Sequence, residues 1–530
     1  IGGYLLMCDA TKPGPINFLR KRKERPAKPF AVMYDNIEKA EEDVMISDVE
    51  RKVLTGKVAP IVLCALSKSH SSNLKRELIA PGLDKLGVFL PYTPLLKLIT
   101  EKLKRPLIAT SGNLSGSPII YKDEEALLRL SSFADYIITF DRDIVTPQDD
   151  SVVQFAKSGK QIIIRRSRGI APNYFPNPFE THEPILAMGA ELKSAFALLD
   201  KNNLYISQFL GDQQSYDSQA GYQATLTHLK NLLKIYPKKI LIDKHPGYNV
   251  SQLGREIGQM EKIAICKIQH HIAHFFAVLG ENNLLNSKEK ILGIVWDGTG
   301  YGDDENIWGG EFFGLENQKV TRVAYLDYFP QLLGDKMSRE PRLSALALCG
   351  HHEMIAEKFK EDEYELFLKH IKMNDGLKTS SMGRFLDGMA SLLNIVQFNT
   401  FEGEAAMKLE VAARQCPVNH YEFYEVSYDK GMLKWNKIPE GVIKDVLQNI
   451  EKSYIARKVF VSLVKMIELV AHDFSSKKIA FSGGVFQNVF LVDLIEEMLG
   501  KKYDLIFHKQ LSPNDESISF GQMAYEMRNR

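Results

Sequence analysis

The chain has little cysteine. Only five of its 530 residues are cysteines, no two of them form a CxxC pair, and their number is odd. A disulfide framework needs an even set, and a cysteine-ligated zinc site needs closely spaced pairs. The sequence therefore argues against both and favours a reducing, cytoplasmic setting. The five are Cys8, Cys64, Cys266, Cys349 and Cys416.

The chain also lacks an excess of charge of one sign and a long apolar run. Lys and Arg number 67 and Asp and Glu 66, so a net charge of +1 gives no argument for a nucleic acid or a membrane surface as partner. Apolar runs such as 291–296 are far shorter than the ~18 residues of a membrane span. The sequence starts at Ile1 rather than Met, without a signal peptide, and we interpret it as a piece of a longer chain.

The composition, 45% hydrophobic and 25% charged, is typical of packed domains. Before residue 180, short strand-like runs alternate with helical stretches, which predicts an α/β domain with a mixed sheet. These runs are 30–34, 61–66, 107–110, 136–140, 151–155 and 161–165. Four prolines then predict a linker over 176–184, between domains at 1–175 and 185–530. They are Pro172, Pro176, Pro178 and Pro184.

The second part contains two similar openings. Residues 185–189 form a strand-like run into a glycine turn, with further strands at 194–199 and 204–208. Residues 291–296 lead into Asp-Gly-Thr-Gly and a strand at 308–315. Later, 478–482 leads into two glycines and an amphipathic helix to about Leu499. Two such lobes suggest the duplicated architecture of actin and sugar kinases.

Two polar segments of the first part could bind phosphate. Residues 20–28 hold six cations in nine positions, which could grip a triphosphate, although a solvated helix end or a nucleic-acid patch would use the same residues. The segment Thr-Ser-Gly-Asn-Leu-Ser-Gly at 110–116 follows a strand, so its backbone amides and hydroxyls could approach phosphate; a polar turn is the alternative.

The most specific local feature of the sequence is a group of three histidines within five residues, 270–274. His270 and His274 lie four apart, so on a helix both imidazoles share one face, a spacing that suits a divalent metal; capping or surface histidines are the alternative. Asp297 ends a strand and Asp515 follows another strand-like run. We therefore expect His270, His274, Asp297 and Asp515 around one metal, iron or zinc. His271 points elsewhere, either to bind substrate or to pack.

Ordered motifs then resemble a known family. KERPAKPFAVM (23–33), APGL (80–83), LGVFLPYTP (86–94), TSGNLSG (110–116) and DDSVV (149–153) resemble the YrdC-like domain. AELK (190–193), QHHIAH (269–274), DGTGYG (297–302), WGGE (308–311), REP (339–341), EGEAAMKLE (402–410) and SGGVFQN (482–488) resemble a Kae/TsaD-like carbamoyltransferase domain. Together, in this order, they resemble the HypF family, which matures [NiFe]-hydrogenases.

The resemblance implies an α/β chain with a YrdC-like twisted-sheet domain and a two-lobed actin/sugar-kinase-like domain. It implies that ATP, with magnesium, and a carbamoyl donor (carbamoyl phosphate or carbamate) give carbamoyl-AMP. The carbamoyl group would then pass to the C-terminal cysteine of HypE, for cyanide ligand synthesis. The catalytic candidates are Lys23, Arg25, Lys28, His270 and His274. The nucleotide-binding candidates are Ser111, Asn113, Ser151, Arg168, Lys193, Gly298, Gly483, Gly484 and Asn488.

Three departures from the family pattern accompany this resemblance. The family's acylphosphatase-like domain and cysteine-rich zinc fingers are missing, so we expect no hydrolysis of carbamoyl phosphate. Leu5 replaces a usual His, and Glu516-Ser517 replace a usual glycine pair after Asp515, where a carboxylate could weaken nucleotide binding. Alternatives are a small-molecule O-carbamoyltransferase, in which the metal domain comes first, and a non-enzymatic nucleotide-binding scaffold. We expect neither nucleic acid nor membrane as a partner.

Overall fold

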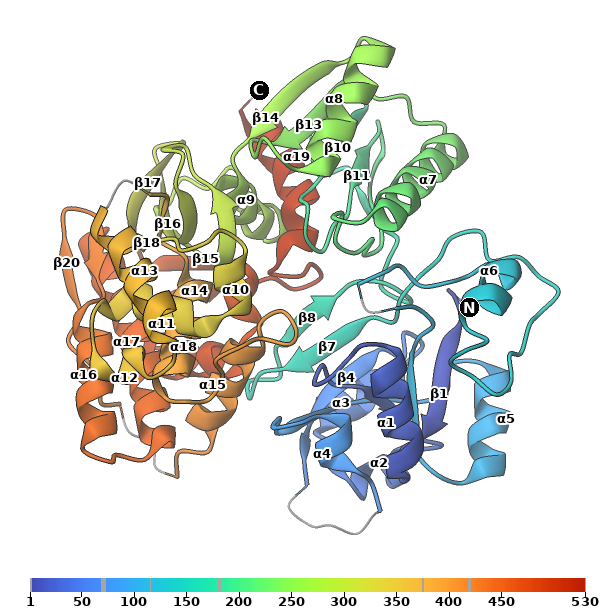
Figure 1. Ribbon diagram of the computed structural model, residues 1–530. Helices are drawn as coiled ribbons and strands as arrows, with labels where there is room; N and C mark the ends of the chain where they lie inside the picture. Colours follow the sequence, from blue (N-terminus) through green and yellow to red (C-terminus); the bar gives the residue numbers. More distant parts are fainter. Residues whose placement is uncertain are drawn as a thin grey trace. The chain divides into compact units, whose positions relative to one another are not determined.

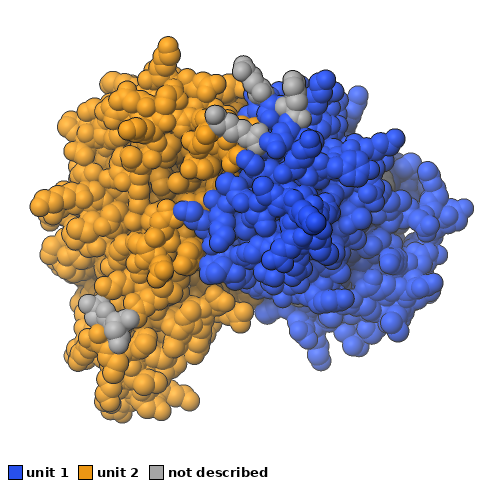
Figure 2. Space-filling view, turned by 90° about the horizontal axis from the view of Figure 1, so that it is seen from above, with its two compact units in different colours: residues 1–155, 159–267, 515–523 blue, residues 156–158, 268–514, 524–530 orange. Residues whose placement is uncertain are grey.

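The computed structural model describes residues 2–67, 73–114, 116–179, 181, 183–373, 376–417 and 421–529. The chain forms two compact units, coloured separately in Figure 2. The first contains residues 1–155, 159–267 and 515–523, and the second 156–158, 268–514 and 524–530. In the part that is described, no helix is both long and apolar enough to cross a membrane.

The first unit begins with a mixed eight-stranded sheet (Figure 1). In spatial order its strands are β1 (Leu5–Asp9), β6 (Leu107–Ser111), β2 (Ala31–Met33), β5 (Lys85–Phe89), β4 (Ile61–Leu66), β7 (Val152–Phe155) and β8 (Gln161–Arg165), with β3 (Val44–Met45) beside β4. The sheet contains both parallel pairs (β2 with β5, β4 with β7) and antiparallel ones, which confirms the predicted mixed sheet. The helices of this part are α1 (Pro13–Arg22), α2 (Ile37–Glu41), α3 (Asp48–Leu54), α4 (Arg76–Ile79), α5 (Pro94–Leu103) and α6 (Asp123–Arg129).

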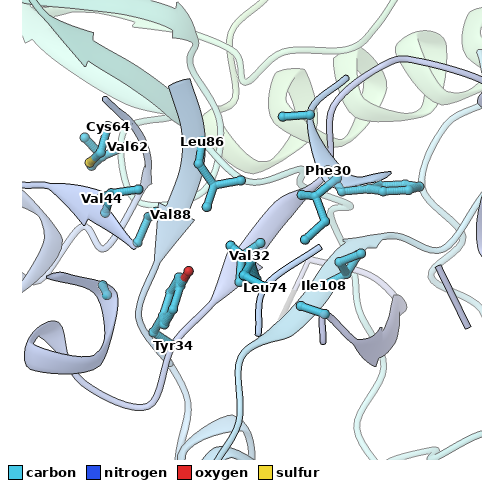
Figure 3. Close-up of a cluster of buried hydrophobic side chains, with 14 of the residues drawn as sticks. Phe30, Val32, Tyr34, Val44, Val62, Cys64, Leu74, Leu86, Val88 and Ile108 are labelled. Atoms are coloured by element: carbon cyan, nitrogen blue, oxygen red, sulfur yellow. The ribbon is translucent and has the colours of Figure 1, made fainter. Parts of the chain in front are cut away.

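The core of this sheet explains one success and one error of the strand prediction. Val32 packs in a cluster with Val62, Leu86 and Ile108 (Figure 3), while its neighbour Met33 packs in a second cluster, so the sheet is buried on both faces. The strand predicted over 136–140 is wrong, because these residues form no strand. Of their four large side chains, Tyr136, Ile138 and Phe140 are exposed, while Ile137 is partly buried against the core.

A second sheet of the first unit has six strands. In spatial order they are β14 (Ala264–Ile268), β13 (Lys239–Asp243), β10 (Ile185–Ala187), β11 (Ala197–Leu199), β12 (Asn203–Ile206) and β9 (Asn173–Pro176). Helices α7 (Tyr216–Leu233) and α8 (Asn249–Glu261) pack on it through Tyr222, Leu226 and Val250. The linker predicted over 176–184 begins at Pro176, the last residue of β9, and its residues 180 and 182 lie outside the described part.

The second unit is built on a nine-stranded sheet. Its main path is β20 (Ser427–Asp429), β21 (Met432–Lys434), β17 (Lys319–Leu326), β16 (Ile307–Glu316), β15 (Ile291–Tyr301), β22 (Lys478–Ser482) and β23 (Asp504–Ile506), with β18 (Phe329–Pro330) and β19 (Lys378–Thr379) off it. The helices are α9 (His270–Glu281), α10 (Lys336–Arg339), α11 (Pro341–Cys349), α12 (Glu353–Ala356), α13 (Glu361–Met373), α14 (Met382–Leu392), α15 (Glu404–Arg414), α16 (Lys437–Leu447), α17 (Lys452–Asp473), η1 (Gly484–Gln487) and α18 (Val489–Leu499). Near the C-terminus lie η2 (Asp515–Ser517) and α19 (Ile518–Arg528).

The last two sheets share one topology. The order β14-β13-β10-β11-β12 matches β23-β22-β15-β16-β17. In each, the opening strand pairs antiparallel with the next strand and parallel with a later one. This duplication confirms the predicted two-lobed architecture, and the ends of β15 and β22 meet where the predicted site lies.

Candidate functional site

Lys23, just after α1, is buried, with 1% of its surface exposed. Its Nζ donates to the carbonyl oxygens of Ser111 (2.6 Å) and Asn113 (2.7 Å) and to Oδ1 of Asn113 (2.8 Å). Burial, and then the charge of Arg25, lower the pKa of Lys23 to about 7. The solvated helix end considered for this segment therefore does not describe Lys23, which holds the loop that follows β6.

Arg25 lies against the same loop. Its Nη1 donates to Oγ1 of Thr110 (3.3 Å) and its Nε to the carbonyl of Lys28 (3.1 Å). Burial, and then the charges of Arg20 and Arg165, lower its pKa to about 9. Lys28 itself is exposed. The structure thus brings Lys23, Arg25, Ser111 and Asn113 together; Ser115 of the predicted loop lies outside the described residues.

Ser151 and Arg168 form a second group. The hydroxyl of Ser151 donates to the carbonyl of Arg168 (2.9 Å), and the Arg168 guanidinium contacts Oδ1 of Asp150 (2.8 Å) and stacks on Tyr92, 3.5 Å from the ring centre. The carboxylate of Asp149 raises the pKa of both Lys23 and Arg25, although burial outweighs it. The backbone carbonyl of Asp149 also accepts from the N–H of Arg168 at 3.0 Å, so Asp149 lies next to both groups.

The three histidines begin helix α9. The side chain of Gln269 accepts from the backbone N–H of Ile272 at 2.8 Å and caps the helix. His270 and His274 lie one turn apart, as predicted, and both face Asp297. The Nε2–Oδ2 distances are 3.7 Å for His270 and 3.1 Å for His274.

The predicted metal ligands are all buried. Asp515 is joined directly to Asn514 of the second unit, and the four residues each offer one ligand atom within 4.8 Å of the others. Burial alone would raise the pKa of Asp297, but hydrogen bonding and attraction to His270 and His274 hold it well below its usual range. Two imidazole nitrogens and two carboxylates fit iron or zinc.

His271 turns away from Asp297, as expected. Its Nδ1 lies 3.3 Å from Nε2 of Gln269 and its ring packs beside Trp308. Burial, and then the charge of His270, keep its pKa well below the usual value, so the ring is neutral. A Cβ on Gly300 would come within 2.4 Å of this ring and 2.9 Å of the His270 ring, which explains the glycine.

The glycine pair after β22 lies close to Asp297. Gly483 has φ +102°, and a Cβ there would lie 2.2 Å from the carbonyl oxygen of Trp296. At Gly484 a Cβ would lie 3.1 Å from Oδ1 of Asp297, while Gly298 faces open space. Asn488 caps α18, since its Oδ1 accepts from the N–H of Leu491 at 2.8 Å.

Two of the predicted nucleotide-site features belong to the first unit. Lys193 lies between β10 and β11, where its backbone N–H donates to Oδ1 of Asp212 at 2.8 Å. Glu516, which the sequence placed where glycine is usual, accepts from the N–H of Arg166 through both oxygens (3.1 and 3.0 Å). Burial raises the pKa of Glu516 to about 7.

Three residues around His274 were not predicted as site residues. Ser482 lies 3.2 Å from His274 Nδ1, and His508 lies 3.0 Å from Ser482 Oγ. Glu281 lies 2.8 Å from His508 Nδ1. Ser482 is the first residue of the SGGVFQN motif. His508 is a single histidine and Glu281 lies at a helix end, and neither pattern indicates a site in the sequence.

The fold and the buried cluster define a class of protein. A family model described as telomere recombination, for Sua5, YciO and YrdC proteins, matches residues 1–167. The HypF Kae1-like domain matches 180–281, and the second subdomain of a Kae1-like carbamoyltransferase domain matches 293–522. The chain is thus a carbamoyltransferase that joins a YrdC-like to a Kae1-like region.

Whole-chain comparisons specify the family. Carbamoyltransferase HypF of Synechocystis is 35% identical over all of this chain and 71% of its own length, and that of Rhodobacter capsulatus is 32% identical over 98% and 70%. A crystal structure of full-length HypF in the phosphate- and nucleotide-bound form gives a TM-score of 0.92 at 32% identity, over all of this chain and 70% of that one. The chain belongs to the HypF family of carbamoyltransferases.

Proposed function

We propose that the chain makes carbamoyl-AMP and passes its carbamoyl group to the C-terminal cysteine of HypE. The observation that carries this proposal is the presence, in one chain, of a buried Lys23–Asn113 loop site and a buried His–Asp cluster. The first suits a polyanion and the second a metal. The nucleotide in the similar HypF crystal structure supports a nucleotide as ligand.

The first step takes place in the YrdC-like region. A carbamate oxygen attacks the α-phosphorus of ATP, and the bond to the β-phosphate oxygen breaks, which releases pyrophosphate. Lys23 and Arg25 stabilise the negative charge that develops on the leaving group, and the exposed Lys28 adds a third cation. Ser111, Asn113, Ser151 and Arg168 position the nucleotide, and magnesium accompanies ATP.

The second step takes place in the Kae1-like region. The HypE thiolate attacks the carbamoyl carbon, the bond to the AMP phosphate oxygen breaks, and AMP leaves. His270, His274, Asp297 and Asp515 would hold one divalent metal, which when bound supplies a Lewis acid. We assign the nucleotide of this step to Gly298, Gly483, Gly484, Lys193 and Asn488, as the family resemblance implies; a Cβ on Gly298 would meet no atom within 4 Å, which leaves room beside Asp297.

The test supplies the protein with ATP, magnesium and either carbamate or carbamoyl phosphate plus an acylphosphatase. We expect pyrophosphate and carbamoyl-AMP, and then a mass gain on HypE equal to a carbamoyl group replacing one hydrogen. A HypE variant without its terminal cysteine is the control and gains no mass. Absence of the adenylate under all these conditions would favour a nucleotide-binding scaffold.

A further inference from the structure

We propose that Ser482, His508 and Glu281 are positioning residues that lock His274 in the tautomer with its proton on Nδ1. This inference rests on the proposed metal role of His274. The contacts run in sequence from His274 Nδ1 to Ser482 Oγ (3.2 Å), to His508 Nε2 (3.0 Å), and from His508 Nδ1 to Glu281 Oε2 (2.8 Å). All four residues belong to the second unit.

The proton direction along this relay follows from its far end. Oε1 of Glu281 accepts from the backbone N–H groups of Lys509 and Leu511, both at 2.9 Å, and of Gln510. Burial alone would raise the pKa of Glu281, but His508 and these amides lower it, so the carboxylate is ionised. An ionised carboxylate only accepts, so Nδ1 of His508 donates to Glu281, and the proposal takes the neutral imidazole, in which Nε2 is then an acceptor.

With His508 in this form, the positions of the Ser482 and His274 protons follow. The Ser482 hydroxyl has one hydrogen, which it donates to His508 Nε2, so its oxygen accepts from His274 Nδ1–H. Nε2 of His274 lies 3.1 Å from Oδ2 of Asp297. A bound metal would use the lone pair of Nε2 and displace the proton that Nε2 otherwise donates to Asp297. Such outer partners fix the tautomer and ring orientation of a metal-binding histidine and raise its basicity.

A Ser–His–Glu row of this kind also occurs where serine is a nucleophile. Here Ser482 is fully buried, and its oxygen is engaged by two imidazoles at hydrogen-bond distance. A nucleophile needs a free face toward its substrate, so the geometry favours positioning. A carbamoyl adduct on Ser482, sought by mass spectrometry after single turnover, would contradict this assignment.

The test compares variants at His508 by their affinity for Co²⁺ in competition with a chelator and by the visible spectrum of the bound Co²⁺. His508→Gln places an amide oxygen where Nε2 accepts, and we expect nearly unchanged affinity and spectrum. His508→Asn keeps a donor for Glu281 but does not reach Ser482. We expect it to lower the affinity about 10- to 100-fold, as loss of an outer-shell partner does, and to shift the spectrum.

Ser482→Ala is the second single variant, and it breaks the relay at the residue that contacts His274. Because both changes break one relay, the double variant Ser482→Ala/His508→Asn should bind Co²⁺ about as weakly as either single variant. Wild-type affinity and spectrum in both single variants, or fully additive losses, would overturn the relay. Metal binding is measured without substrates. The Co²⁺ affinities therefore still test the relay if the protein transfers no carbamoyl group. A wild-type protein that binds no divalent metal would overturn both the relay and the proposed metal role.

Discussion

The two candidate sites solve opposite electrostatic problems. In the YrdC-like region, Lys23 is buried and Arg25 is half-buried, both donate to carbonyls of a loop and its flanks, and burial lowers their pKa values to about 7 and about 9. In the Kae1-like region, imidazoles face a carboxylate, and their attraction lowers the pKa of Asp297 although burial opposes it. At Lys23 and Arg25 burial outweighs the charge of Asp149, whereas at the second site imidazole nitrogens and carboxylate oxygens lie close together. This difference supports our proposal that the first site binds an anion and the second a cation.

The largest effect should come from His274→Ala, which separates the two sites. Loss of a ligand should reduce bound metal by more than the roughly 10- to 100-fold that an outer-shell partner costs, and carbamoyl transfer should stop. Formation of pyrophosphate should continue, because Lys23 and its loop are untouched. Metal content, pyrophosphate release and the mass of HypE are measured on one preparation.

His370→Ala is the matched control for this change. His370 is an exposed histidine on α13, and its removal should leave metal content and transfer unchanged. Joint loss of adenylate formation and transfer in folded His274→Ala would break the division between the two sites.

The two sites also differ in how far the sequence predicted them. The His270/His274 pair was predictable because both residues sit on one helix, where spacing fixes the shared face. Burial of Lys23 was not, because a run of charges normally lies in solvent, and its acceptors at 111 and 113 come from a strand far along the chain.

Contacts between residues far apart in the sequence could not be predicted. His508 and Glu281 are 227 positions apart, and only the pairing of β22 with β15 and β23 brings their surroundings together. The strands at 61–66, 161–165 and 478–482 were predicted to the residue, because apolar runs between polar ends are local signals. The run at 136–140 has the same apolar pattern but pairs with no strand, so the prediction there was wrong.

Lys23→Met should have the next largest effect, in the opposite site. It removes a charge and three donors from the loop, and we expect adenylate formation to fall by about 10²-fold, as for other preorganised donors. Metal content should not change. Lys21→Met, an exposed lysine on α1, is the control and should retain full activity. Pyrophosphate release and metal analysis together check both expectations.

The pKa of Lys23 also predicts a pH dependence of ATP binding. With a pKa of about 7 in the free protein, Lys23 is an ammonium below pH 7 and mostly neutral above it. Because ATP prefers the ammonium, its affinity should be constant below pH 7 and fall up to about tenfold per pH unit above it. Titration calorimetry between pH 6.5 and 8.5 measures this and the accompanying proton uptake. The Lys23→Arg variant should show a flat profile, since guanidinium does not titrate in this range.

The smallest effect should come from Asn488, where capping and nucleotide binding can be separated. Asn488→Ala removes the cap of α18 and should lower the free energy of unfolding by about 1 kcal/mol. Asn488→Asp keeps the cap, because aspartate accepts equally well from the Leu491 N–H, and stability should be retained. Its added charge should still weaken binding of AMP severalfold, because two anions would then face each other. Thermal unfolding and AMP titration of the two variants give the comparison. Unchanged AMP affinity in Asn488→Asp would leave Asn488 a helix cap alone and remove it from the nucleotide site.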